Sequence, residues 1–421
     1  AAVLRPAMTS GRRVCVVGAG IVGASTALAL QRDGHDVVLI DRDGPAAGAS
    51  SGNAGAIVNA SCAPTAMPGV VFDVFRMIGR PLAPFNIRPA YLPRALPWML
   101  RFLLESRIAR VRENARHLHA LTKEAVSAWD TLVRGTEMSK LLRPTGWLKV
   151  YETDAAFART RHARSLMEEL AVPHEILGAD QIRELEPALA PIFTRGLLQP
   201  DSLQVINPGK MVRAMAELFA ARGGRFLRLY VRRIESGAGT LLLHGASQSV
   251  SADLAVIAAG ARSRDLAASA GDRVPLDAER GYHLMLAPEN SNLLRRPVLN
   301  GDHSFVLSPM QEGLRLTSQV ELAGCDAAPD YRRVRRLVEC ASRMLPGLVP
   351  GEHSVWMGCR PSLPDSLPVL GFSPGNRSII YAFGHQHLGM TLGPVSALLV
   401  ADLAAGRRPA HDLEPYRINR F

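Results

Sequence analysis

The sequence predicts an α/β fold in which a nucleotide-binding domain is interleaved with a second, α+β domain. Three observations carry this prediction. A β-branched run in 12–20 ends in closely spaced glycines, and a helix-like stretch and a second buried run, 35–41, follow it. A third buried run ending in glycine, 252–263, comes much later. Long segments with strand and helix patterns of their own separate these runs, so the chain leaves the first domain and returns to it.

The glycine-rich turn carries the clearest motif, G-x-G-x-x-G, at the start of the predicted helix. The first glycine permits a tight turn, the second lets the backbone approach a pyrophosphate, and the third lets helix and strand pack closely. An acidic residue at the end of the second run is placed to accept hydrogen bonds from ribose hydroxyls. A glycine-rich turn without a ligand is the alternative. The expected cofactor-binding residues of this unit are Gly18, Gly20, Ile21, Val22, Gly23 and Asp41.

The stretch after Asp41 favours FAD over a nicotinamide cofactor. Residues 42–59 are rich in Gly, Ala and Ser, which suits a backbone lying against a long ligand, whereas a nicotinamide enzyme more simply continues into another helix and strand. A flexible surface loop is the alternative interpretation. The expected contacts are Arg42, Ser50, Ser51, Asn53, Ala54 and Gly55, followed later in the chain by Val231, Ala259 and Gly260.

The same patterns divide the chain into two discontinuous domains. The nucleotide-binding domain is assigned residues 11–86, 196–274 and 354–421, and the second domain residues 87–195 and 275–353. A helix, a Gly-Gly stop and a strand through Val231 are expected within 209–235. The second domain is expected to contain helices in 113–135, a strand in 146–153, strands and a hairpin in 281–322, and an amphipathic helix in 331–345.

Composition and charge are those of a globular enzyme with a basic surface. The 421 residues are 47% hydrophobic and 21% charged, with a formal net charge of +11. This charge fits an arginine-rich surface, an anionic membrane or acidic ligands. No basic motif interleaved with aromatic residues is present, so no nucleic-acid partner is expected. The five cysteines are scattered without C-x-x-C spacing, which argues against a disulfide framework and a zinc site and favours a reducing compartment.

Ordered matches along nearly the whole chain carry a family resemblance. They include "VVGAGIVGASTALAL", "GASSGNAG", "PTAMPGV", "IRPAYLPRALPWMLRFL", "RGYHLML", "WMGCRPSLPDSLPVLG" and "YAFGHQHLGMTLGP". With them the chain resembles the small-subunit type of FAD-dependent D-amino-acid dehydrogenase, in the wider group of D-amino-acid oxidase, glycine oxidase and sarcosine oxidase. Among subgroups it is similar to enzymes acting on D-proline or D-hydroxyproline. The resemblance implies a Rossmann-type FAD-binding domain interleaved with an α+β substrate-binding domain, whose antiparallel sheet covers the flavin ring.

The resemblance also implies a substrate anchor. In related oxidases an arginine that precedes a proline binds the substrate carboxylate, and Arg360 is the matching residue. A guanidinium offers two parallel N–H donors to a carboxylate, and Pro361 and Pro364 restrict the loop expected to carry it. A structural ion pair of Arg360 with Asp365 is the alternative. Tyr282, on a strand expected to face the flavin, is assigned a contact with the carboxylate or a place capping the pocket, and its alternative is a core aromatic residue with a satisfied hydroxyl.

The carboxy-terminal stretch 382–394 is typical of a strand, a glycine turn and a helix. In the family this turn directs backbone N–H groups at the flavin pyrimidine, where negative charge develops on reduction. His385 is the third catalytic candidate. His385 and His387 are interpreted as turn residues beside the flavin, and no metal is expected because no third ligand recurs nearby. The matching cofactor-binding positions are Gly384, Leu388, Gly389, Met390 and Thr391.

The implied reaction is oxidative deamination of a D-amino or cyclic imino acid by hydride transfer from its α-carbon to flavin N5. FAD is expected to be noncovalent, because Cys359 is offset by one residue from the cysteine that tethers flavin in some sarcosine-oxidase relatives. Electrons are expected to pass to a quinone or another acceptor. An oxidase that makes hydrogen peroxide from oxygen is the alternative.

Two basic helical stretches, 95–112 and 331–345, bear on where this reaction takes place. Basic amphipathic helices can lie on an anionic membrane surface. Together with the resemblance to dehydrogenases, they favour a cytoplasmic enzyme in peripheral contact with the inner face of the cell membrane. Ordinary core-facing amphipathic helices are the alternative.

Overall fold

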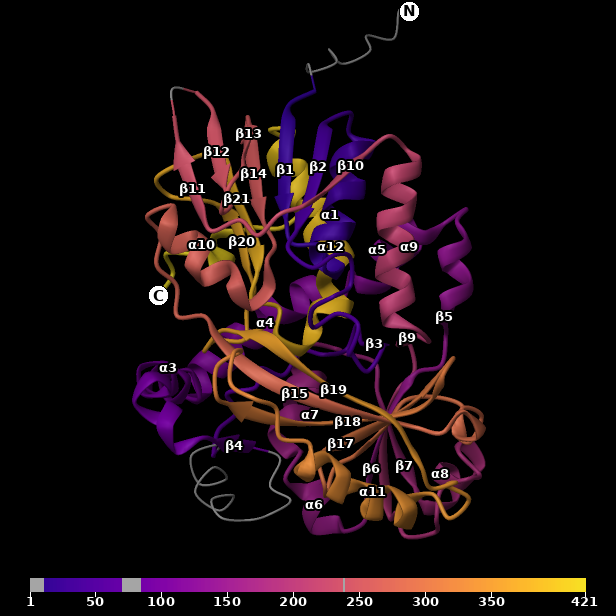
Figure 1. Ribbon diagram of the computed structural model, residues 1–421. Helices are drawn as coiled ribbons and strands as arrows, with labels where there is room; N and C mark the ends of the chain where they lie inside the picture. Colours follow the sequence, from indigo (N-terminus) through magenta and orange to yellow (C-terminus); the bar gives the residue numbers. More distant parts are fainter. Residues whose placement is uncertain (1–10, 70–84, 238) are drawn as a thin grey trace, which may run out of the picture.

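The structure is a computed structural model that describes residues 11–69, 85–237 and 239–421. Two sheets dominate it, a six-stranded one in the upper half of Figure 1 and a nine-stranded one in the lower half. Residues 70–84, which the sequence assigns to the nucleotide-binding domain, lie outside the described residues. The predicted combination of a Rossmann-type domain with an α+β domain that contains an antiparallel sheet is confirmed.

The six-stranded sheet has a doubly wound order. Its strands are, in order, β10 (Arg225–Arg228), β2 (Asp36–Asp41), β1 (Arg13–Val17), β14 (Leu254–Ile257), β21 (Ile379–Phe383) and β20 (Val369–Phe372). The first five run parallel, and β20 is antiparallel at one edge. From β1 the chain passes to β2 on one side and later to β14 on the other. Open α/β sheets bind ligands in the crevice where the order reverses in this way.

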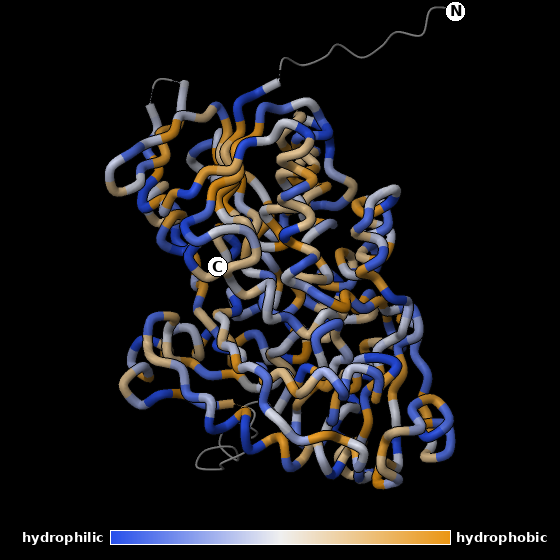
Figure 2. Tube along the Cα trace, turned by 45° about the vertical axis from the view of Figure 1, so that its right-hand side comes forward, coloured by the Kyte–Doolittle hydropathy of each residue, from blue (hydrophilic) through white to orange (hydrophobic). Residues whose placement is uncertain are grey.

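Helices cover one face of this sheet and a small sheet covers the other. Val14 and Val16 of β1 pack on the first layer, formed by α1 (Ile21–Arg32), α5 (Ala125–Val133), α9 (Pro208–Ala221) and α12 (Gly389–Ala404). Cys15 and Val17 pack on the second, formed by β11 (Arg233–Ser236), β12 (Leu241–His244), β13 (Ser249–Ala252) and α10 (Ser263–Ser269). Because both faces are buried, the strands are apolar on both sides, and Figure 2 shows them as an orange layer.

The helix at the carboxy-terminal end of the chain is the core helix of this domain. Within the part of the chain that the structure describes, one helical segment, Gln386–Ala404, is long and apolar enough to span a membrane by length and composition. It is 72% buried, and α12 packs against both α1 and α5. Its apolar character is therefore accounted for by packing inside the protein.

The nine-stranded sheet carries the second domain. Its order is β19 (Glu352–Ser362), β15 (Asp277–Leu286), β18 (Gly313–Leu322), β17 (Phe305–Met310), β16 (Val298–Asn300), β6 (Trp147–Tyr151), β8 (Arg195–Gln199) and β7 (Glu175–Gly178), with β4 (Phe85–Ile87) paired to β18. All its pairs are antiparallel except β16 with β6 and β18 with β4. One face packs on α8 (Ala179–Leu185) and α11 (Arg332–Met344). The opposite face turns toward the nucleotide-binding domain.

Smaller elements join and flank the two domains. A three-stranded sheet of β3 (Ala56–Ile57), β9 (Leu203–Val205) and β5 (Leu142–Arg143) belongs to segments that connect them. The remaining helices are α3 (Leu92–Glu105), α4 (Ile108–Thr122), α6 (Asp154–Ala158) and α7 (Arg161–Glu169). Of these, α3 lies at the left edge of the lower half in Figure 1.

Three predicted domain boundaries, at 86, 196 and 354, fall inside strands. β4, β8 and β19 all belong to the nine-stranded sheet, so the second domain is larger than predicted. Consequently Arg360 lies in strand β19, and the prediction that a stiff loop carries it is wrong. Pro361 is tolerated in this strand because β19 is the edge strand of the sheet, where a missing backbone N–H leaves no ladder incomplete.

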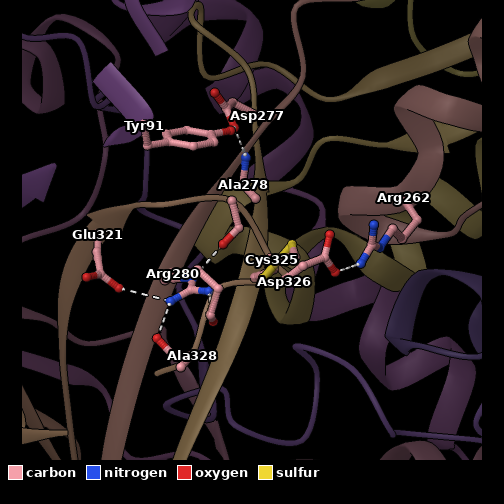
Figure 3. The surroundings of a disulfide bond; sticks show 12 residues. Tyr91, Arg262, Asp277, Ala278, Arg280, Glu321, Cys325, Asp326 and Ala328 are labelled. Atoms are coloured by element: carbon pink, nitrogen blue, oxygen red, sulfur yellow. Dashed lines mark hydrogen bonds and ion pairs between the residues drawn. A yellow bond between two sulfur atoms is a disulfide. The ribbon is translucent and has the colours of Figure 1, made fainter. Parts of the chain in front are cut away.

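The prediction drawn from the cysteine pattern, that the chain has no disulfide framework, is also wrong in one respect. Cys325 and Cys359 form a disulfide with a Cα–Cα separation of 5.9 Å. Cys359 lies opposite Arg280 of β15, and Arg280 donates hydrogen bonds to carbonyl groups of the loop that carries Cys325 (Figure 3). The pairing of β15 with β19 thus brings together two cysteines that are 34 residues apart in the sequence. Because disulfides persist mainly outside reducing compartments, this pair does not support the predicted reducing compartment. The Cys359 thiol is also occupied, so it is not free to tether flavin.

Candidate active site

The glycine turn after β1 is shaped by its own packing and opens toward the crevice. Gly18 has a φ of +108°, and a Cβ atom there would lie 2.3 Å from the Ala258 carbonyl oxygen. A Cβ atom on Gly23 would lie 1.8 Å from the Gly18 carbonyl oxygen. At Gly20 a Cβ atom would approach only Ser50 Oγ, at 3.1 Å. Gly18 and Gly23 are therefore required by the protein itself, whereas Gly20 leaves room for a ligand at the N-terminus of α1.

Asp41 and Ser50 hold this turn in place. Asp41 Oδ2 accepts a hydrogen bond from the Ala19 N–H at 2.8 Å, and its Oδ1 accepts from Asp43 and Gly44. Ser50 Oγ accepts from the Ile21 N–H at 2.9 Å. A carboxylate oxygen can accept two hydrogen bonds. Oδ2 of Asp41 therefore retains one acceptor position, which is compatible with the predicted ribose contact.

The other predicted contacts in this domain lie near the same edge of the six-stranded sheet. Ala259 and Gly260 lie two and three residues after the end of β14, and Ala259 Cα would be 2.9 Å from a Cβ on Gly18. Arg42 follows β2, is exposed and forms an ion pair with Asp43. Val231 is buried in the apolar cluster under the sheet, in the segment between β10 and β11, because β10 ends at Arg228 and not at Val231 as predicted.

The loop 50–55 bridges the two domains. Arg315 of β18 donates hydrogen bonds to the carbonyl oxygens of Ser51, at 3.0 Å, and Asn53, at 2.6 Å. His283 Nδ1 lies 3.2 Å from the Gly52 carbonyl oxygen, and a Cβ on Gly52 would lie 2.0 Å from the Trp356 ring. Ala54 and Gly55 continue the loop into β3. This loop is not a flexible surface segment, as one interpretation allowed, because three side chains of the nine-stranded sheet fix it.

Sequence reasoning missed Arg315, His283 and Trp356, which hold this loop. The sequence could have indicated them only by their spacing, because each lies two residues along its strand from another residue that faces the site. That signal could be used only once the facing side of each strand was known.

The turn before α12 is fixed by hydrogen bonds on several sides. Gln386 has a φ of +49° and donates to the Leu363 carbonyl oxygen at 2.9 Å. The Trp129 indole donates to the Met390 carbonyl oxygen at 2.8 Å, and Thr391 Oγ1 accepts from the Val58 N–H at 3.2 Å. The remaining predicted contacts, Gly384, Leu388 and Gly389, belong to the same turn. A rigid turn of this kind keeps its backbone groups in a set orientation toward a ligand.

His385 points away from the site, into the protein. Its Nε2 lies 2.8 Å from Ser396 Oγ on α12, and only 4% of the residue is exposed. Burial lowers its pKa to about 3, so the ring is neutral at neutral pH. The prediction of a catalytic role is wrong in geometric terms, because the positive φ of Gly384 and of Gln386, on either side of His385, turns the chain so that His385 anchors the turn to α12.

Arg360 lies on the face of the nine-stranded sheet that turns toward the nucleotide-binding domain. It stands directly opposite Glu279 of β15, and its guanidinium lies over Gly281, where a Cβ atom would be 2.3 Å from Nη2. The same face carries Trp356 and His283, whose rings stack 5.1 Å apart. Burial lowers the pKa of Arg360 and raises the pKa of Glu279, and each charge opposes the shift of the other. Asp365, the alternative partner, pairs with Arg420.

Tyr282 lies on the opposite face of this sheet. Its hydroxyl donates to Glu321 at 2.5 Å, and its ring packs edge-on against Tyr331, with 2% of the residue exposed. The prediction that Tyr282 contacts the substrate carboxylate is therefore wrong. Successive residues of a strand point to opposite faces, and in β15 it is Gly281 and His283 that face the site.

His387 approaches the same space from the other domain. Its side chain is solvent-accessible, yet burial among protein atoms, together with the positive charges of Arg360 and Lys149, lowers its pKa to about 4. His387 is thus accessible to solvent although many protein atoms surround it. The electrostatic effect of both cations means that both lie near it. At pH 7 the ring is neutral.

We expect Gly281→Ala to weaken substrate binding. The added methyl group would overlap the guanidinium of Arg360, which must then move because the strand backbone cannot. KM for the substrate should rise roughly tenfold, as expected for displacing a positioned charge-assisted hydrogen bond. Steady-state kinetics with saturating acceptor measure this. Gly237→Ala is the control, because a Cβ there would have a single neighbour at 3.3 Å, far from the site; an equal rise in KM for both variants would contradict the explanation.

The geometry combines a dinucleotide-binding turn, an ordered loop and an arginine on the sheet face that contacts this loop. A family model described as FAD dependent oxidoreductase, DAO, matches residues 13–403. The chain belongs to the DAO family of FAD-dependent oxidoreductases. The open position at Gly20, the remaining acceptor on Asp41 and the fixed turn 384–391 fit FAD, so this DAO-family protein has a site suited to the cofactor of its family.

Relatives of this DAO-family protein match it over nearly their full length. It is 36% identical to a D-amino-acid oxidase of Bradyrhizobium diazoefficiens over 98% of this chain and 100% of the relative. It is 31% identical to D-amino acid dehydrogenase 2 of Ralstonia nicotianae over 97% of this chain and 100% of the relative. Among solved structures, glycine oxidase from Geobacillus kaustophilus superposes with a TM-score of 0.70, at 25% identity and with 97% and 99% of the two chains covered.

Proposed function

We propose that this protein is a D-amino-acid dehydrogenase that oxidises a D-amino or cyclic imino acid at its α-carbon. The observation that carries the proposal is the placement of Arg360, which stands opposite Glu279 on the sheet face that contacts loop 50–55 and acts on His387 of the turn 384–391. A buried guanidinium offers bidentate hydrogen bonds to a carboxylate. The relatives named D-amino-acid oxidase and D-amino acid dehydrogenase give additional support for a D-amino-acid substrate.

The residues of the glycine turn, loop 50–55 and turn 384–391 would hold FAD, which when bound supplies the acceptor for a hydride from the substrate. Arg360 would bind the α-carboxylate and so fix the orientation of the α-carbon. A low-dielectric space that also contains the positive charges of Arg360 and Lys149 favours the neutral form of the substrate amine, so no dedicated base is needed.

Anaerobic mixing of the FAD-loaded protein with single D- and L-amino acids, D-proline included, tests this proposal. We expect the flavin absorbance to bleach with D-amino acids and not with their L-enantiomers. Failure of every amino acid to bleach the flavin would contradict the proposal. Admission of air then separates the two candidate activities: recovery only after a quinone is added indicates a dehydrogenase, and rapid recovery in air with peroxide formation indicates an oxidase, the activity in the name of one relative.

A membrane-facing helix favours the dehydrogenase over the oxidase. On α3, four leucines spaced by four residues form an outward stripe and are about half exposed: Leu92 45%, Leu96 48%, Leu100 55% and Leu104 51%. A hollow beside this helix is lined by Asp277 and four arginines, Arg94, Arg101, Arg264 and Arg273. An apolar stripe flanked by arginines fits an anionic lipid surface, where a quinone acceptor would be dissolved. The location we propose is the surface of a cell membrane; the cytoplasmic face follows the resemblance to dehydrogenases, and the Cys325–Cys359 disulfide favours an oxidising compartment instead.

This contact predicts binding to anionic vesicles. In a flotation assay with vesicles of phosphatidylglycerol and phosphatidylcholine, the protein should float at low salt and float less at high salt. The double variant Leu96→Glu/Leu100→Glu should remain at the bottom of the gradient. Ile176→Glu is the matched control, because Ile176 is similarly exposed, 47%, but lies on β7 at the far edge of the sheet. Equal flotation of the double variant and the wild type would refute the α3 contact.

A further inference from the structure

The indole ring of Trp356 lies between two buried glycines, one in loop 50–55 and one in its own strand, β19. A Cβ atom on Gly52 would lie 2.0 Å from Cζ3 of the ring, and a Cβ atom on Gly358 would lie 1.9 Å from Cη2. The ring also stacks on His283, whose Nδ1 lies 3.2 Å from the Gly52 carbonyl oxygen. Because neither glycine has a side chain, the indole packs directly on both backbones. It therefore fixes how closely the loop approaches β19.

The loop connects this contact to the two segments that fit FAD. Ser50 Oγ accepts a hydrogen bond from the Ile21 N–H at the start of α1, at 2.9 Å. Asn53 Nδ2 donates to the His387 carbonyl oxygen in the C-terminal turn, at 3.4 Å. A shift of the loop on β19 would therefore act on the glycine turn and on the C-terminal turn together.

The strand that carries the ring also carries the arginine assigned to the substrate. Trp356 and Arg360 lie four residues apart on one face of β19, which is about 13 Å along a strand. Between them, Gly358 stands directly opposite Gly281 of β15. The edge of the indole lies over Gly358 and the guanidinium lies over Gly281. Since opposite Cβ positions are about 4.5–5.5 Å apart, the two groups stand side by side, and the ring joins the loop to the strand that holds Arg360.

We propose that Trp356 is a positioning residue whose ring sets the distance between loop 50–55, and with it FAD, and a substrate held by Arg360. The proposal rests on the proposed function, because it takes the loop to hold FAD and Arg360 to bind the α-carboxylate. A misplacement of about 1 Å between reacting groups can lower a rate roughly 100-fold. A displaced ring should therefore lower the rate of flavin reduction, whereas the substrate affinity, which the guanidinium determines, should change little.

The test is a double-mutant cycle followed by the anaerobic rate of flavin reduction by a D-amino acid, at saturating FAD. Gly358→Ala places a methyl group against Cη2 and pushes the ring, while loop 50–55 keeps its own sequence. We expect the reduction rate at saturating substrate to fall roughly 10- to 100-fold, with little change in the substrate Kd obtained from its concentration dependence. Phenylalanine lacks the indole atoms that would overlap, so Gly358→Ala/Trp356→Phe should regain most of the rate.

A second cycle approaches the same ring from the loop. Gly52→Ala should lower FAD affinity, measured by fluorescence titration of the apoprotein, and Gly52→Ala/Trp356→Phe should restore it; this measurement does not depend on turnover. Gly347→Ala is the glycine control, because the nearest atom to a Cβ there is 3.7 Å away. Met357→Leu is the control for Trp356, since Met357 packs on the opposite face of the sheet. Both controls should keep the wild-type reduction rate and FAD affinity.

Three results would overturn the inference: wild-type reduction rates in both glycine variants, losses that Trp356→Phe does not relieve, or a loss confined to Tm and FAD affinity. The last would mean that the ring only stabilises the fold. Each of these leaves the proposed function intact as long as D-amino acids bleach the wild-type flavin. If no amino acid bleaches it, both proposals fail.

Discussion

Arg360→Gln is expected to lower kcat/KM for a D-amino acid roughly 100- to 1000-fold, because removing one partner of a buried charge pair costs about 2–5 kcal/mol. FAD should stay bound, since Asp41 and Ser50, in the other domain, hold the dinucleotide-binding turn. Rates of anaerobic flavin bleaching measure the loss, and the flavin spectrum before mixing reports the bound cofactor. The kcat/KM of Arg360→Lys should lie between those of the wild type and Arg360→Gln, because an ammonium keeps the charge and loses the bidentate geometry.

Two further variants separate substrate binding from folding. Arg360→Gln leaves Glu279 buried without the positive charge that favours its ionised form, so Arg360→Gln/Glu279→Gln removes the uncompensated acid as well. If activity stays low in the double variant while the flavin spectrum is normal, the loss is one of substrate binding. Recovery of activity in the double variant would instead mean that the arginine serves only to balance Glu279. Arg336→Gln, at an exposed position on α11, is the surface control.

Gly23→Ala is expected to abolish stable FAD binding and to lower Tm by several degrees. The new Cβ atom would lie 1.8 Å from the Gly18 carbonyl oxygen, a backbone atom that has no rotamer to adjust. Either α1 moves away from β1 or the turn opens, and overpacking of this kind costs about 1–3 kcal/mol or more. Because the turn is also the place where the pyrophosphate would lie, we expect FAD affinity to fall at least about 100-fold.

Gel filtration followed by the absorbance ratio of flavin to protein measures FAD retention, and thermal unfolding at a fixed FAD concentration measures the change in Tm. Gly375→Ala is the matched control, because no atom lies within 4 Å of the Cβ position there and its φ is ordinary. It should keep its FAD and its Tm. A Gly23→Ala protein that retains FAD after gel filtration would show that the turn adjusts, and that the close contact of α1 with β1 is not essential.

The nucleotide-binding unit could be predicted from the sequence because its signals are local. A short apolar run, a turn that needs a positive φ at Gly18 and a helix that needs no Cβ at Gly23 lie within twelve residues of each other. The disulfide and the domain boundaries could not be predicted in this way. The disulfide and the boundaries both depend on the pairing of β15 with β19. In the sequence a complete hairpin and a helix lie between these two strands.

The face of β15 illustrates the same limit within one strand. All ten of its residues are buried, so the strand has no alternation of polar and apolar residues to show which side turns to the flavin. Tyr282 was assigned to the site on the resemblance, and the structure placed it in the opposite core, whereas Gly281 and His283 face the site.

The sequence by itself determined the βαβ unit, the alternation of the two domains and the candidate arginine, because local patterns and ordered motifs report these directly. Only the tertiary structure decided which side chains share a sheet face with Arg360. Lys149, Thr317 and Trp356 come from three separate segments, and the register of six paired strands places them on one face. Register is a property of the assembled sheet, and a shift of one residue would turn each of these side chains away from the site.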